Sequence, residues 1–291
     1  MAAPDSAGLT ANEMAARLAW LKAKGGNQTK AQLVALLKKQ LHVEEIANGC
    51  IVQTISLPDL ARHLNGTALP SGNDPVWQAL TTGTFNECAN SGVDVLNSIR
   101  VLSQLRRDNA IRKGCVLLAW SFKDGQLREL IGAAVVSEFV QNADFGTAVL
   151  SPQDMSSIGA YFTKHAYIDT MCASQVGVGP LLVRHAYVYA CKNFGGLTAL
   201  AMHIGGSTQS APDHARFRSQ RMFHRLGFTV HGPTHIKPTN TQKDWYRGSW
   251  VTLLADKPGV TKMLQQGMSQ SNPCVRVGLT ATTNDRLMWR C

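Results

Sequence analysis

The sequence lacks any long run of apolar residues, any Cys-x-x-Cys pair and any strong excess of acidic side chains. No stretch approaches the roughly 18–20 apolar residues that a membrane-spanning helix needs. Residues 1–11 include Asp5 and lack the apolar core of a secretory signal. An apolar fraction of 44% in 291 residues excludes a wholly disordered chain and a small disulfide framework. We therefore expect an intracellular protein, nuclear or cytoplasmic, without membrane contact.

The seven cysteines are scattered, and none has a partner at the spacing of a metal site. His231 and His235 are four residues apart, but the Gly-Pro-Thr run between them argues against a shared helical face. We predict no metal site. We also expect the cysteines to be reduced thiols that pack as small apolar side chains.

Acidic residues are scarce, with 19 Asp and Glu against 29 Lys and Arg, so the formal net charge is +10. The excess is concentrated in residues 181–250, which carry nine basic and two acidic side chains, whereas residues 1–48 contribute only +2. A basic region attracts phosphate in a nucleic acid, in a nucleotide cofactor or on an anionic surface. Charge alone does not choose among these partners, and a solvated cationic face is the alternative.

Residues 9–41 predict two short amphipathic helices separated by Gly25-Gly26. Thr29 is a good N-cap for the second helix, whose apolar stripe comprises Leu33, Leu36, Leu37 and Leu41. The Lys30-x-x-Leu33-Val34 portion resembles the SAP domain, a small DNA-binding module. That resemblance implies that five lysines face phosphate groups, namely Lys22, Lys24, Lys30, Lys38 and Lys39. The alternative is a helical hairpin that packs on the next domain or contacts a protein.

From residue 50 onward, strands and helices follow one another in an α+β order. Asp124-Gly125 predicts the turn of an antiparallel hairpin. The expected strands cover 51–56, 115–122, 127–140, 160–172, 197–203, 228–231 and 250–254, and the expected helices cover 76–85, 93–111, 180–193 and 215–226.

A Gly-x-Gly turn, Gly177 to Gly179, separates the strand that ends near residue 172 from the helix that follows. Pro180 suits the first position of that helix. Free N–H groups and the helix dipole favour a pyrophosphate at such a place, and glycine lets the phosphate approach the backbone. The sequence has neither the third glycine nor the later acidic residue that a dinucleotide-binding motif requires.

Two motifs together resemble the GNAT superfamily of N-acetyltransferases over roughly residues 48–256. The segment 175–179 resembles the acyl-CoA pyrophosphate loop of that family, and the segment 222–228 resembles the end of its later helix, with Phe223 where many members have Tyr. The resemblance implies a mixed, mostly antiparallel sheet flanked by helices, and acetyl transfer from acetyl-CoA to an amine. It implies that cofactor contacts come from Met171, Cys172, Gln175, Val176, Gly177, Val178, Gly179 and Pro180.

In this family, backbone N–H groups polarise the thioester where two parallel strands splay apart, here near residues 169–172 and in 197–203. As the catalytic base we consider Asp169 and His165, four apart on one strand and hence on one face, with Glu138 as a weaker candidate. Each could instead be a hydrogen-bonded structural group. The acceptor is left open among a protein lysine, an N-terminus and a small amine, on a DNA- or chromatin-associated protein if the SAP resemblance holds.

We thus expect three parts: a SAP-like module over 1–45, a GNAT-like domain over 46–256 and a polar tail over 257–291, which starts with a short helix over 260–266. A different class of function is also open. The chain could be a catalytically silent protein that keeps the fold for binding nucleic acid or a cofactor.

Overall fold

The computed structural model describes residues 28–63, 78–80, 85, 88, 95–109, 111–123, 126–138, 148–150, 165–194, 199–205, 219, 221–238 and 246–269. Within these residues, eight strands form one sheet in the order β1-β2-β3-β5-β6-β8-β7-β4. Their bounds are β1 Cys50–Ser56, β2 Gly114–Lys123, β3 Gln126–Glu138, β4 Ala148–Leu150, β5 His165–Ala173, β6 Ala199–Gly205, β7 Thr229–Pro238 and β8 Tyr246–Leu254. Among these strands β5 and β6 are parallel, and the other neighbours are antiparallel. The predicted mixed, mostly antiparallel sheet is therefore confirmed.

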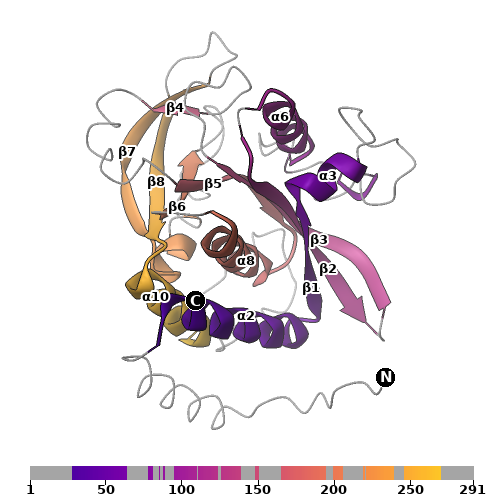
Figure 1. Ribbon diagram of the computed structural model, residues 1–291, viewed down its shortest axis with the longest axis vertical. Helices are drawn as coiled ribbons and strands as arrows, with labels where there is room; N and C mark the ends of the chain where they lie inside the picture. Colours follow the sequence, from indigo (N-terminus) through magenta and orange to yellow (C-terminus); the bar gives the residue numbers. More distant parts are fainter. Residues whose placement is uncertain are drawn as a thin grey trace, which may run out of the picture.

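Helices cover both faces of this sheet (Figure 1). On one face, α2 (Lys30–Ala47), α8 (Val178–Asn193) and α10 (Lys257–Ser269) share a cluster of buried apolar side chains with the strands. On the other face, α3 (Leu57–His63) and α6 (Val95–Arg107) pack around a second cluster. We call these two sides the α8 face and the α6 face.

Helix α2 is an integral part of the α8 face. Thr29 and Gln32 form a reciprocal capping box at its start, in which the Gln32 N–H donates to Thr29 Oγ1 at 3.3 Å and the Thr29 N–H to Gln32 Oε1 at 2.8 Å. In its apolar stripe, Leu33, Leu37 and Leu41 are buried against the domain, and Leu36 is partly buried. The helix predicted after Thr29 is confirmed, but it extends beyond the expected boundary at residue 45. It belongs to the core of the main domain rather than to a separate module.

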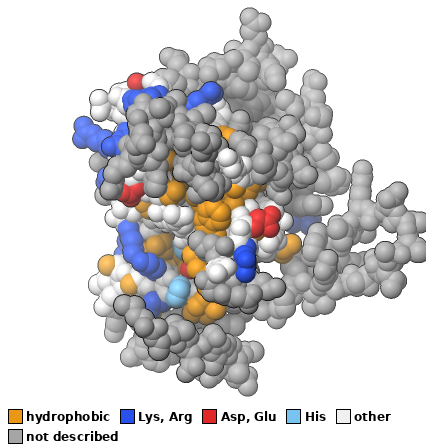
Figure 2. All heavy atoms as spheres, turned by 90° about the vertical axis from the view of Figure 1, so that its right-hand side faces the viewer, with side chains coloured by type: hydrophobic (Ala, Val, Ile, Leu, Met, Phe, Trp, Pro, Cys, Tyr) orange, Lys and Arg blue, Asp and Glu red, His pale blue; other side chains and the backbone are white. Residues whose placement is uncertain are grey.

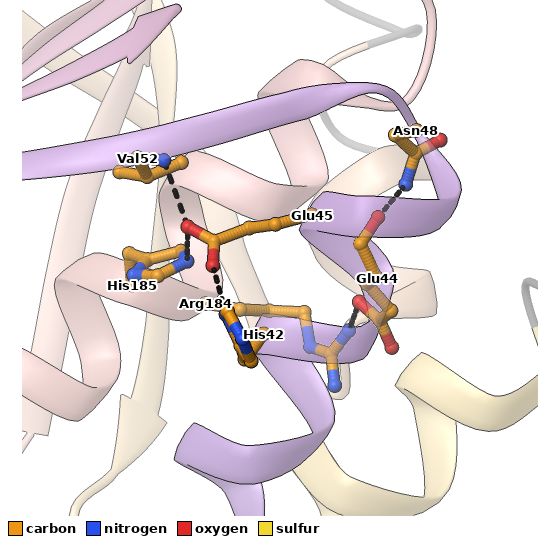
Figure 3. A network of polar contacts seen from close by, with 7 residues as sticks. All are labelled: His42, Glu44, Glu45, Asn48, Val52, Arg184 and His185. Atoms are coloured by element: carbon orange, nitrogen blue, oxygen red, sulfur yellow. Dashed lines mark hydrogen bonds and ion pairs between the residues drawn. The ribbon is translucent and has the colours of Figure 1, made fainter. Parts of the chain in front are cut away.

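A polar network fastens α2 to α8 and to β1 (Figure 3). Arg184 of α8, only 2% exposed, forms an ion pair with Glu44 near the end of α2. The adjacent Glu45 accepts a hydrogen bond from the Val52 N–H at 2.7 Å through its Oε1 atom, and His185 Nε2 lies 3.3 Å from the same oxygen. Because Glu45 occupies a backbone donor of β1, an edge strand of the sheet, the network also covers part of that edge.

The short helix expected over residues 260–266 is confirmed as part of α10, but residues 257–269 complete the core rather than begin a polar tail. Val260 and Met263 are fully buried in the cluster of the α8 face. Gly259 allows the helix to approach β8, since a Cβ at this position would lie 1.9 Å from the carbonyl oxygen of Leu254. Tyr187 of α8 donates a 2.7 Å hydrogen bond to the same oxygen. Val260 and Met263 thus form a short apolar stripe within an otherwise polar sequence.

The surface on the β1 side carries exposed apolar side chains. Ile46 of α2 is 56% exposed, and Ile51 of β1 and Phe122 of β2 are 37% and 40% exposed. Figure 2 faces this side and shows hydrophobic side chains reaching the surface between charged ones. In the part of the chain that the structure describes, no helix is both long and apolar enough to cross a bilayer.

A disulfide joins Cys88 to Cys172 of β5, with 6.4 Å between the two Cα atoms. The expectation that all cysteines are reduced is therefore wrong for this pair. Cys50, Cys115 and Cys191 are free thiols. The sequence gives no signal for the pairing, because 84 residues separate the two partners.

Candidate functional site

The parallel strands β5 and β6 separate in the middle of the sheet. They pair from His165 opposite Ala199 to Ile168 opposite Met202. Beyond that point β5 continues along β3 alone, and β6 continues along β8 alone. Past Ile168, β5 therefore has no strand of the described sheet beside it on the β6 side. Unpaired backbone donors in the middle of a sheet are available for a ligand.

A β-bulge lies where the strands separate. Ile168 pairs with Val136 and Thr170 with Val135, so Asp169 is an extra residue in β5. The bulge reverses the alternation of the strand. Before it, Ile168 packs into the α8 face; after it, Met171 does so, while Cys172 packs into the α6 face.

The bulge directs Asp169 toward the α6 face. Its carboxyl accepts a hydrogen bond from Ser98, a buried residue of α6. Burial raises the pKa of this carboxyl, and the hydrogen bond from Ser98 opposes the increase. Asp169 therefore combines a partly desolvated carboxyl with a position at the opening of the sheet. Sequence reasoning missed Ser98, because a serine within an amphipathic helix carries no distinctive signal.

His165, the other predicted base, lies at the opposite end of the paired region. Its backbone pairs with Ala199 at the start of both strands. Four residues of extended chain separate its Cα from that of Asp169 by about 13 Å. Glu138, the weaker candidate, accepts hydrogen bonds from the Arg112 and Lys113 N–H groups, which gives it a structural partner. The structure does not bring these three residues together at one point.

The turn after β5 presents backbone donors at the start of α8. Gly177 is the N-cap and has a φ of 90°, a conformation that favours glycine. The Ser174 N–H and hydroxyl both donate hydrogen bonds to the carbonyl oxygen of Ile131, at 2.9 and 3.0 Å. The N–H groups of Gln175, Val176, Gly177 and Gly179 donate to none of the described residues. Helix α8 begins at Val178, so Pro180 is its third residue rather than its first as predicted.

Few side chains crowd this turn. Val176 is 63% exposed, and a Cβ on Gly177 would meet only the Asn48 side chain, with 3.3 Å to its Oδ1. A Cβ on Gly179 would lie 3.4 Å from the sulfur of Met222 and 4.0 Å from the terminal methyl group of Met171. The turn, β5 and the helical residues 221–225 therefore meet at Gly179.

The later helical motif has its aromatic residue in the core. Phe223 is fully buried and makes an edge-to-face contact with Phe228, with 5.0 Å between the ring centroids. Met222, the preceding residue, is only partly buried and lies beside Gly179. Phe223 therefore has neither a proton to donate nor a position on the surface of the turn.

Several other predicted site residues lie elsewhere. The side chain of Cys172 is engaged in the disulfide. Lys38 and Lys39 are exposed on α2, and Lys30 at its start is partly buried. Lys22 and Lys24 lie outside the described residues.

A separate pocket of about 120 Å³ between β7, β8 and α10 is lined in part by Leu254, which pairs with the first residue of β6. It therefore lies at the opposite end of the sheet from the turn.

No protein-family model matches the chain, and no curated protein matches its sequence. Solved structures of N-acetyltransferases do match its shape. The structure of yncA from Salmonella typhimurium, with its cofactor acetyl-CoA, is 15% identical with a TM-score of 0.35, covering 71% of this chain and 94% of that chain. An enzyme from Staphylococcus aureus Mu50 is 10% identical (TM-score 0.33; 71% and 97% covered). NAA60 of Arabidopsis thaliana, in complex with a bisubstrate analogue, is 12% identical (TM-score 0.34; 70% and 97% covered). Similarity at this level does not establish a shared function.

Proposed function

We propose that this protein is an acyl-CoA-dependent N-acetyltransferase that transfers an acetyl group from acetyl-CoA to an amine. The observation that carries the proposal is the separation of β5 from β6, which opens directly into a turn with unpaired N–H groups. An extended thioester arm needs both features, a polar backbone edge for its amides and an anion site for its pyrophosphate.

The turn fits a pyrophosphate by the chemistry of its donors. Gln175, Val176, Gly177 and Gly179 contribute unused N–H groups, and the N-terminus of α8 adds the positive end of its dipole. The absence of side chains at Gly177 and Gly179 leaves the backbone accessible. We assign this turn as the pyrophosphate site, with Met171, Cys172, Val178 and Pro180 as flanking residues.

When bound, acetyl-CoA supplies a thioester whose carbonyl carbon forms a bond to the acceptor nitrogen while its bond to sulfur breaks, giving an amide and the free thiol of CoA. Backbone N–H groups of β5 past the bulge are held in place by the ladder with β3. Fixed donors of this kind stabilise negative charge on the carbonyl oxygen without reorganising, because the strand has already fixed their orientation.

We assign Asp169 as the group that accepts the amine proton. It lies at the opening of the sheet and points toward the α6 face, opposite the face that carries the turn. A raised pKa moves a carboxylate closer to the range of a useful general base. His165 stays the alternative base. Phe223 cannot protonate the departing sulfur, but a thiol with a pKa of about 8.5 leaves as the thiolate near neutral pH without a dedicated acid.

The acceptor is an amine on a protein lysine, an N-terminus or a small molecule. The DNA-binding hypothesis is not carried into this proposal, since α2, which carries Lys30, Lys38 and Lys39, packs into the domain. The catalytically silent alternative draws support from the buried Phe223. It predicts that acetyl-CoA binds but no acetylated product forms with any member of a broad amine panel.

Calorimetric titration of the full chain with acetyl-CoA tests the proposal. The variant Gly177→Glu should weaken binding by at least about tenfold, because a carboxylate at the turn repels the pyrophosphate. Gly227→Glu is the matched control: Gly227 also has a positive φ, 86°, but lines the pocket at the other end of the sheet. Unchanged binding in Gly177→Glu, with loss only in the control, would contradict the assignment of the turn.

A further inference from the structure

Three methionines border the opening between β5 and β6, one from each element around it. Met171 lies on β5 just past the bulge, and Met202 is the last residue of β6 that pairs with β5. Met222 belongs to the helical residues 221–225. All three are partly buried and pack against the apolar cluster of the α8 face. They therefore lie on the same side of the sheet, together with the turn.

Two of the three side chains, those of Met171 and Met222, meet near Gly179. A Cβ on Gly179 would lie 3.4 Å from the sulfur of Met222 and 4.0 Å from the terminal methyl group of Met171. Met202 pairs directly with Ile168, the residue before the bulge. Ala173, also partly buried in the same cluster, adds another small side chain. None of these four side chains is charged, aromatic or β-branched.

Unbranched thioethers make this lining compliant. Methionine has three rotatable bonds and a polarizable sulfur, so it fills irregular space and rearranges at little cost. A rigid apolar pocket can discriminate by about tenfold or more for one added methylene. A compliant wall of methionines does not discriminate as sharply against an added methylene. A charged acyl group, in contrast, would bury a carboxylate without a partner.

From this lining we infer that the protein accepts straight-chain aliphatic acyl groups longer than acetyl, such as butyryl, and rejects dicarboxylic ones such as succinyl. The inference rests on the proposed function, because it names the acyl donors of that same opening. The methionines act as specificity-determining residues on the α8 face. The acceptor amine and Asp169 lie toward the α6 face, so a longer acyl chain does not compete with the acceptor for space.

The test is a binding titration of the full chain with acetyl-CoA, butyryl-CoA, succinyl-CoA and free CoA. Butyryl-CoA should bind within about threefold of acetyl-CoA, whereas succinyl-CoA should bind at least about tenfold more weakly. Met171→Ile and Met202→Ile stiffen the wall with a β-branched residue that strands favour. Each should weaken the binding of butyryl-CoA about tenfold more than it weakens the binding of acetyl-CoA. Leu36→Ile, in a partly buried residue of α2 packed on the same cluster, is the matched control and should change neither affinity.

The outcomes separate this inference from the proposed function. Binding of acetyl-CoA together with butyryl-CoA weaker by about tenfold or more overturns the inference alone. Isoleucine variants that leave the preference for chain length unchanged overturn it as well. If neither free CoA nor any acyl-CoA binds, the proposed function fails and the inference with it.

Discussion

Arg184 and Glu44 form an ion pair across the junction of α8 and α2, and the guanidinium is almost wholly buried. Two other nitrogens of Arg184, Nε and Nη2, have no hydrogen-bond partner among the residues that the structure describes. A single acidic contact, with Glu44, therefore compensates the buried positive charge of Arg184. This relationship makes the attachment of α2 sensitive to the loss of Glu44.

Glu44→Ala should lower the free energy of unfolding by about 1–3 kcal/mol, because it leaves the Arg184 charge buried and uncompensated. Adding Arg184→Met should recover part of this loss, since the charge itself is then removed. Urea denaturation measures both variants, with Glu129→Ala as a control at an exposed glutamate of β3. A double variant less stable than Glu44→Ala would contradict the account.

Acid should weaken the same junction through Glu45. Burial alone would raise its pKa, but His185, the Val52 N–H and His42 together hold the pKa below its usual value of 4.5. The unfolded chain therefore binds this proton more readily than the folded one, and the stabilisation is present above pH 4.5 and lost as the pH falls through and below it. Glu45→Gln should flatten the acid side of the stability profile measured by urea midpoints. A parallel loss in both proteins would exclude this role.

Gly177→Ala should destabilise the protein for two separable reasons. A φ of 90° costs an alanine about 1–2 kcal/mol, and the new Cβ lies 3.3 Å from Asn48 Oδ1. Adding Asn48→Ala should relieve the contact but not the conformational cost. Gly177→Asn should be less destabilising than Gly177→Ala, because asparagine tolerates this conformation better. Thermal unfolding of the four proteins checks this order, and full recovery in the double variant would exclude backbone strain.

The Cys88–Cys172 disulfide should be detectable as a linked peptide when unreduced protein is digested and analysed by mass spectrometry. Replacing both cysteines by serine should lower the free energy of unfolding by roughly 2–4 kcal/mol. The two cysteines are 84 residues apart, and without the disulfide the unfolded chain between them gains conformational freedom. Cys191→Ser, at a partly buried free thiol, is the control. Equal stability of the double variant with and without reductant, together with a reductant-sensitive wild type, is expected.

Asp169→Asn should separate stability from activity. The raised pKa of Asp169 means that the folded state holds this proton more tightly, so ionisation costs stability once the pH exceeds the value for the unfolded chain. The amide variant should therefore be at least as stable as the wild type at pH 7. Its turnover with an accepted amine should fall by about 100-fold or more if Asp169 is the base. Unchanged turnover would transfer that role to His165.

The local signals in the sequence predicted much of the fold. The alternation in residues 51–56 and the Asp124-Gly125 signal correctly placed β1 and the β2–β3 hairpin. The Gly177 turn marked the start of α8, although Pro180 misplaced it by two residues. These features depend on neighbouring residues, which a single sequence shows directly.

The features that the sequence did not reveal depend on distant contacts. Helix α10 joins the core through Val260 and Met263. The burial of these two residues becomes apparent only when α10 is packed against α2. The pairing of Cys88 with Cys172 and the contact of Ser98 with Asp169 each join segments far apart in the chain. The bulge at Asp169 depends on the register with β3, which no local pattern specifies.

That bulge also divides β5 into two segments of opposite phase. Ala166 and Ile168 serve one core, whereas Cys172, although separated from them by an even number of residues, serves the other. A saturation screen of the strand should therefore find that every second position requires an apolar residue and that this alternation shifts by one residue at Asp169. Deleting that one residue would restore regular alternation along the strand, keep Ile168 and Met171 on the α8 face and remove the carboxylate at the opening. One additional residue thus allows a single strand to present a carboxylate to one layer of the protein and a thioether to the other.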